Sequence, residues 1–153
     1  MNRHCALMHH TIEVARKAAH TGQLPFAAIL VRDDRVLVEA GNSVVATRDV
    51  TRHAIMNLAG VAQQQLSLDE RQKCTVFCSC EPCPMCAGLI YWLGITQVVF
   101  GCSTKAWQQI CGQSVSLPCT DIFRHCHPAI ETVGPVAEEQ VAQLLMEFWP
   151  HPT

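Results

Sequence analysis

Two cysteines in this chain have the spacing of ligands for a metal ion. Cys83 and Cys86 stand three positions apart in the segment Pro82-Cys83-Pro84-Met85-Cys86, where Pro84 suits the first position of a helix. At a helix start both sulfurs can face one point, and the helix dipole there favours the thiolate that binds metal. Two thiolates and one imidazole would neutralise Zn²⁺ and leave a fourth tetrahedral position open. An open position is typical of a catalytic rather than a structural zinc site.

The third ligand must come from elsewhere in the chain, and His53 is the best candidate because it lies at the start of another expected helix. His125 and His127 flank Cys126, and short tracts of this kind can also bind metal, although they fit no helical or hairpin ligand geometry well. Solvated or hydrogen-bonded roles are expected for the remaining histidines that we considered, which are His4, His9, His10, His20 and His151.

An iron–sulfur cluster is a weaker interpretation of the same cysteines. Cys80, Cys83 and Cys86 form two successive C-x-x-C steps, but the usual run continues with a fourth cysteine and a proline. Ile90 and Tyr91 occupy those two positions. Cys74, Cys78 and Cys80 alternate along an expected strand, where they are better interpreted as small core side chains.

The elements that position these residues follow from the apolar periodicity and the turn residues. Strands are expected at residues 26–31, 36–40, 75–79, 96–101 and 129–133, with a hairpin turn at Asp33-Asp34 and a polar loop at 41–50. Helices are expected at 5–19, at 53–65 with Thr51 as N-cap, from Pro84 to just before Gly94, at 121–125, and after Gly134-Pro135. This order predicts an α/β fold, with helices on both faces of a mixed sheet, and a single domain over residues 1–153.

Composition excludes some classes of protein. The 153 residues are 49% hydrophobic and 16% charged, which is typical of a globular chain, and the formal net charge of −2 gives no bulk attraction to nucleic acid. Although there are ten cysteines, no apolar export segment and no run of membrane-spanning length is found. We therefore expect a cytoplasmic protein, not bound to membranes, whose thiols are mostly free.

The chain resembles the cytidine and deoxycytidylate deaminase superfamily, and within it the resemblance is greatest to the guanine deaminase and guanosine deaminase branch. The signature half Pro-Cys-x-x-Cys is intact at residues 82–86. Further matches are Pro25-Phe26-Ala27-Ala28, Gly41-Asn42 and the segment 87–92, which ends in Trp92. The resemblance implies a three-layer α-β-α sandwich with a five-stranded mixed sheet, a Zn²⁺ cofactor and a homodimer.

The resemblance also assigns residues to the site. It implies that His53, Cys83 and Cys86 bind zinc, and that the substrate contacts Phe26, Asn42, Ala54 and Trp92. The C-terminal segment is implied to pack over a pocket, either that of this chain or that of a partner subunit, with Asp121, Phe148 and Trp149 as candidates. Without the resemblance, Phe26 and Trp92 are equally well interpreted as ordinary core aromatics.

One position departs from the family signature His-x-Glu, because this chain reads His53-Ala54-Ile55. In the family, zinc supplies an activated water and the glutamate moves protons between that water, the ring nitrogen and the departing amine. Ile55 has no proton to move, and Glu81 does not obviously replace the lost group. Read by periodicity alone, Ile55 simply belongs to an apolar stripe of its helix. We expect very little deaminase activity with zinc binding retained.

Three functions remain open from the sequence. The favoured one is a hydrolytic deaminase of a purine base or nucleoside, with guanine or guanosine first, altered at the single position Ile55. The second is a non-catalytic zinc protein that binds a nucleobase. The third is tRNA adenosine deamination, and the acidic balance and the lack of a Lys/Arg-rich segment near the zinc residues count against it.

Overall fold

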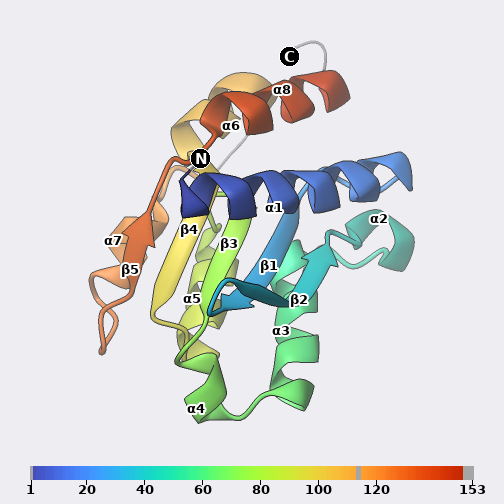
Figure 1. Ribbon diagram of the computed structural model, residues 1–153. Helices are drawn as coiled ribbons and strands as arrows, with labels where there is room; N and C mark the ends of the chain where they lie inside the picture. Colours follow the sequence, from blue (N-terminus) through green and yellow to red (C-terminus); the bar gives the residue numbers. More distant parts are fainter. Residues whose placement is uncertain (1, 113–114, 150–153) are drawn as a thin grey trace.

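A five-stranded mixed sheet forms the middle of the molecule in the computed structural model, which describes residues 2–112 and 115–149 (Figure 1). Its strand order is β2-β1-β3-β4-β5, with β1 antiparallel to both neighbours and with β3, β4 and β5 parallel. The strands are β1 (Ala27–Arg32), β2 (Arg35–Gly41), β3 (Thr75–Cys80), β4 (Gln97–Cys102) and β5 (Glu131–Val133). The predicted strands are all present.

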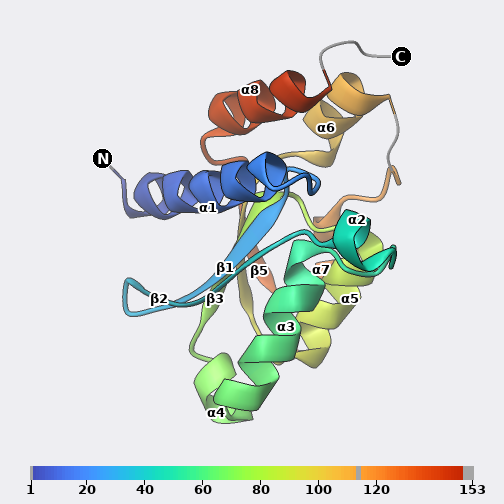
Figure 2. The ribbon, with the colours of Figure 1, turned by 90° about the vertical axis from the view of Figure 1, so that its right-hand side faces the viewer.

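Helices cover both faces of this sheet, so the expected α-β-α sandwich is confirmed (Figures 1 and 2). On one face lie α1 (Arg3–His20), α6 (Thr104–Cys111) and α8 (Glu138–Phe148). On the other lie α3 (Ala54–Gln65), α5 (Pro84–Trp92) and α7 (Cys119–Phe123). Two short helices complete the set, α2 (Val44–Thr47) and α4 (Leu68–Arg71).

Alternating side chains of the central strands build two cores, one under each helical layer. In β1, Ala28 and Leu30 pack with the α3 and α5 layer, whereas Ile29 and Val31 pack with the α1 and α8 layer. All of these side chains are buried, which is why this strand is a continuous apolar run rather than an alternating one. The sheet is thus packed on both faces, and the core on the side of α3 and α5 holds both of these helices to it.

Local signals explain where the sequence predicts the elements well and where it fails. Asp33 and Asp34 have φ of 49° and 62°, the pair of positive values that a tight type I′ hairpin requires. Thr51 was the wrong N-cap, because its hydroxyl bonds the Asp49 carboxylate and His53 occupies the cap position of α3. The prediction also missed α2, α4 and α6, of which the first two are single turns.

No helix in the described ranges has the length and apolar character needed to cross a lipid bilayer.

Gly101 in β4 is required by close packing between the layers. A Cβ there would lie 2.5 Å from the Ser79 carbonyl oxygen and 2.7 Å from Val141 Cγ2 of α8. We expect Gly101→Ala to lower the free energy of unfolding in urea by about 1–3 kcal/mol, because backbone and helix would have to shift. The matched control is Gly60→Ala in α3, where a Cβ would meet nothing within 4 Å. That change should raise stability by about 0.4–1 kcal/mol, and equal effects of the two substitutions would contradict the interpretation.

Candidate metal centre and pocket

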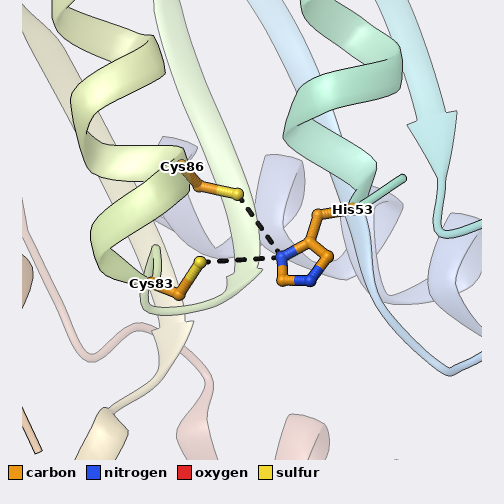
Figure 3. Close-up of side chains that lie close together, drawn as sticks. All are labelled: His53, Cys83 and Cys86. Atoms are coloured by element: carbon orange, nitrogen blue, oxygen red, sulfur yellow. Dashed lines mark hydrogen bonds between the residues drawn. The ribbon is translucent and has the colours of Figure 1, made fainter. Parts of the chain in front are cut away.

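Two helix starts and the end of a central strand meet at one point of the structure. His53 is the N-cap of α3 and Cys83 is the N-cap of α5, with Pro84 at the first helical position. Cys86 lies one turn further along α5 and is 2% exposed. Strand β3 ends at Cys80, so the short segment after it delivers both sulfurs to the histidine (Figure 3).

The three side chains lie at the separation that zinc requires. His53 Nδ1 is 3.6 Å from the Sγ atoms of both Cys83 and Cys86, and all three candidate ligand atoms lie within 4.8 Å of one another. Tetrahedral bonds of about 2.3 Å to sulfur and 2.0–2.1 Å to nitrogen give an N···S separation of about 3.6 Å. The residues therefore fit a Zn²⁺ ion bound by one nitrogen and two sulfurs.

The three groups strongly alter one another's protonation. A hydrogen bond with Cys86 and another with His53 lower the pKa of Cys83 to about 4, against the opposing effect of burial. The hydrogen bond with Cys83, together with burial, raises the pKa of Cys86 far above that of an ordinary thiol. Contact with Cys83 also raises the pKa of His53. Two thiolates this close repel each other, and a divalent cation would allow both to form.

The other sequence candidates for a metal site are not brought together. His53, Cys83 and Cys86 form the single group of three or more possible ligands within the described part of the chain. Cys80 lies outside it, paired with Cys102 on the neighbouring strand β4, and the interaction with Cys102 and burial raise the pKa of its thiol. His125, Cys126 and His127 likewise form no such group.

A pocket of about 290 Å³ opens directly beside the metal ligands. Its walls are mostly apolar or sulfur-containing, as in many small-molecule sites. Besides the three ligands, it is lined by Leu24, Phe26, Ala27, Asn42, Ala54, Ile55, Cys78, Ser79, Cys80, Glu81, Pro82, Thr104, Trp107 and Val115. The space can therefore hold a planar organic molecule next to a bound cation.

Asn42 supplies a hydrogen-bond donor to this pocket. Its side-chain oxygen accepts from the Val44 N–H at 3.0 Å, and its backbone N–H donates to the Phe26 carbonyl at 3.0 Å. The side chain is 4% exposed, and its amide nitrogen has no hydrogen bond within the described residues. A buried donor of this kind costs free energy until it is paired, so it is available to a ligand acceptor.

Asn57 of α3 holds the Asn42 loop in place. Its side-chain amide donates to the Gly41 carbonyl at 2.9 Å and to Ser43 Oγ at 2.8 Å, on either side of Asn42. The helix that begins at His53 therefore also fixes the polar wall of the pocket.

The Glu81 carboxylate is hydrogen-bonded to the backbone at the starts of two helices. Its two carboxylate oxygens accept from the backbone N–H groups of Thr104, at 2.7 Å, and Cys119, at 2.8 Å. These are the first residues of α6 and α7, where unpaired N–H groups and the helix dipole favour a negative charge. Both oxygens are thus occupied, which agrees with the expectation that Glu81 does not replace a missing acid.

Of the expected substrate contacts, Phe26, Asn42 and Ala54 line the pocket, and so does Ile55, which is 5% exposed. Contrary to expectation, Trp92 does not line the pocket, and the residue is 78% exposed. It is the last residue of α5, nine positions after Cys83 and hence about 13 Å along the helix axis from the ligands. It is therefore an exposed residue far along this helix and not part of the pocket wall of this chain.

The C-terminal candidates Asp121, Phe148 and Trp149 do not line the pocket. Asp121 pairs with Arg124 at 3.4 Å on α7 and does not line the pocket. Phe148 is 39% exposed, whereas Trp149 packs against two pocket aromatics without lining the pocket itself.

Among the pocket residues that sequence analysis did not assign to the site, three come from α6 and the segment after it, namely Thr104, Trp107 and Val115. Signals for this helix were present. Ser103 caps it by accepting from the Ala106 N–H, and Gly112 ends it with φ of 74°. The N-cap serine and C-terminal glycine could have identified the helix, but nothing in the spacing places Trp107 in the pocket.

Comparisons with known proteins agree with this geometry. The family model described as "Cytidine and deoxycytidylate deaminase zinc-binding region" matches residues 1–102. A probable cytosine deaminase from Schizosaccharomyces pombe is 34% identical over 150 residues, covering 94% of this chain and 91% of the relative. The guanine deaminase of Bacillus subtilis is 40% identical over 68 residues, 44% of each protein. Several tRNA-specific adenosine deaminases match at 26–29% identity.

Solved structures share the fold. A guanine deaminase from Nitrosomonas europaea superposes with a TM-score of 0.81 at 23% identity, covering 94% of this chain and 83% of that one. Another neighbour with the same TM-score was solved in complex with 8-azaguanine.

We expect Cys83→Ser and His53→Ala to abolish stoichiometric zinc binding, because each removes one of three ligands. Zinc per chain, measured by elemental analysis of purified protein, should fall close to zero in both variants. Removal of zinc with a chelator should lower the Tm of the parent chain, since binding to the folded site adds to stability. Cys126→Ser is the control, because Cys126 lies outside the group. A full zinc complement in Cys83→Ser would exclude this metal centre.

Proposed function

This chain belongs to the cytidine and deoxycytidylate deaminase family, and we propose that it is a zinc-dependent hydrolytic deaminase scaffold for a purine base or nucleoside. Guanine or guanosine is the favoured ligand. Turnover by the chain itself is severely reduced because Ile55 occupies the position of the proton-transferring glutamate. The observation that carries the proposal is the placement of Ile55 in the same small pocket as His53, Cys83, Cys86 and Asn42.

Each pocket residue has a role that its chemistry supports. His53, Cys83 and Cys86 would hold zinc, which when bound supplies an activated water and an electrophile in this family of reactions. The Asn42 amide nitrogen would donate to a ring acceptor of the base and fix its orientation. Phe26 offers an aromatic wall to a planar ring. Ala54 has no large side chain that would fill the space next to His53.

The same geometry explains a low turnover. Ile55 is buried and lines the pocket next to the ligand residue His53, but its side chain neither accepts nor donates a proton. Loss of a positioned general acid–base lowers the rate by roughly 10²- to 10⁴-fold. The only carboxylate among the described lining residues is that of Glu81, whose oxygens accept from two helix starts. No other group described in the pocket replaces the missing function.

The charge of the pocket favours an uncharged ligand. Neither lysine nor arginine is present among the described residues that line it, and Glu81 is the one acidic side chain there. Phosphate groups are normally bound by basic side chains or exposed helix N-termini, and the N-caps of the helices α3 and α5 at this pocket are the proposed metal ligands His53 and Cys83. A free base or nucleoside therefore fits the pocket better than a nucleotide, and the formal net charge of −2 gives no bulk attraction to tRNA.

A second candidate function is a zinc protein that binds a nucleobase without reacting, and the apolar Ile55 favours it. This function uses the same pocket and the same zinc-binding residues. The two candidate functions therefore differ only in whether an acid restored at position 55 gives an efficient enzyme. Gain of turnover at this position is thus the discriminating measurement.

We expect Ile55→Glu to raise the rate of ammonia release by about 10²-fold or more, because it restores a proton-transferring group beside the metal ligands. The panel contains guanine, guanosine, adenine, adenosine, cytosine and cytidine, with bound zinc quantified in each sample. Ile55→Gln is the matched control, since it has nearly the same shape as glutamate but cannot transfer the proton. Equal rates in the glutamate variant and the parent, with zinc present in both, would overturn the assignment of Ile55.

Ligand charge gives an independent prediction. Guanine or guanosine should bind the zinc-loaded parent chain at least as tightly as guanosine monophosphate. Affinity should change little between low and high salt, because the lining residues that the structure describes include neither lysine nor arginine. Isothermal titration calorimetry at two salt concentrations measures both quantities. Tight tRNA binding that weakens steeply with salt would instead support the tRNA alternative.

A further inference from the structure

Three aromatic rings form a closed cluster at one wall of the pocket. Phe26 and Trp107 lie edge to face, with ring centroids 5.2 Å apart and an interplanar angle of 82°. Trp107 and Trp149 are 4.9 Å apart at 73°, and Phe26 and Trp149 are 6.0 Å apart. Contacts of this geometry stabilise one ring arrangement over others.

The rings come from three separate parts of the chain. Phe26 immediately precedes β1, Trp107 lies in the middle of α6, and Trp149 is the C-cap of α8. Helices α6 and α8 lie side by side in both views (Figures 1 and 2) and pack against each other. The Trp149 N–H donates to the Leu145 carbonyl at 2.8 Å, which fixes its backbone to the last turn of α8.

Only two of the rings reach the pocket. Phe26 and Trp107 line it, whereas Trp149 lies behind them. Trp107 is half-buried, and it contacts two other rings at steep angles. A second ring contact from outside the pocket limits how far Trp107 can turn away from the pocket.

We propose that Trp107 is the stacking wall that selects a bicyclic over a monocyclic base, and that Trp149 is the residue that positions it. This inference rests on the proposed function, because it names the residue through which the same pocket distinguishes its ligands. Trp107 contacts the ligand, and Trp149 acts through Trp107.

The physical reason is the matching of ring surfaces. An indole has two fused rings, so a purine stacked on it buries more apolar surface than a pyrimidine does. Asn42 offers the same amide N–H donors to either kind of base and therefore does not by itself distinguish them. The apolar neighbours Leu24, Ile55 and Val115 give shape without further polar contacts.

The test is equilibrium binding by the zinc-loaded full chain, with 8-azaguanine as the bicyclic probe and cytosine as the monocyclic one. Trp107→Ala should weaken 8-azaguanine binding by roughly tenfold or more, the usual effect of removing a stacking aromatic. Trp107→Phe should retain most cytosine affinity and reduce the preference for 8-azaguanine by about threefold. Trp92→Ala is the matched control, because Trp92 lies at the exposed end of α5.

Fluorescence provides a readout that loss of packing alone would not mimic. The chain has three tryptophans, so the double variant Trp92→Phe, Trp149→Phe leaves Trp107 as its single indole. Binding of 8-azaguanine should change the Trp107 emission in this variant. Trp149→Ala should lower the preference for 8-azaguanine, and Trp149→Phe should restore it, because a ring again supports Trp107. Zinc content and Tm are measured for every variant.

The outcomes separate the two proposals. If the parent binds 8-azaguanine and Trp107→Ala binds it equally well, Trp107 is not the stacking wall, while the nucleobase site still holds. If the emission of Trp107 does not change although calorimetry detects binding, the direct contact is likewise excluded. If the zinc-loaded parent binds neither probe, the proposed function and the stacking wall both fail.

Discussion

The whole site depends on the meeting of two helix N-termini beside the end of one central strand. His53 caps α3 and Cys83 caps α5, so the single core that holds both helices to one face of the sheet also sets the 3.6 Å separations between the nitrogen and the two sulfurs. Helix starts stabilise negative charge, and the two cysteines must provide it to a cation. The short segments that begin α3 and α5 therefore both start the packed helices and supply the metal ligands.

Much of the architecture was predictable because its signals are local. The strands follow apolar runs, the hairpin follows Asp33-Asp34, and Cys83 and Cys86 follow from a spacing of three at a helix start. His53 could be proposed from its place on an expected helix, but the pairing of α3 with α5 is a tertiary property. Periodicity carries no information on which helices become neighbours.

The failures have the same origin. Trp92 was assigned to the pocket by resemblance, yet it lies at the far end of the helix whose first turn carries the ligands. Trp107 was not identified, because its place in the pocket wall depends on the tertiary position of α6. Ile55 shows the opposite case, in which the apolar stripe was interpreted correctly as core while the same residue also lines the site. At this position an apolar side chain suits the core, whereas the family reaction needs an acid.

Glu81 gives the pocket a modular construction. Its carboxylate joins the first residues of α6 and α7, and Cys83 follows only two residues later in the chain. The stretch between those two attachment points, residues 104–119, supplies Thr104, Trp107 and Val115 to the pocket but none of the metal ligands. During evolution this stretch can therefore be replaced as a unit, which changes the ligand that the pocket binds and leaves the metal ligands unchanged. The condition is that both attachment points keep their backbone N–H groups.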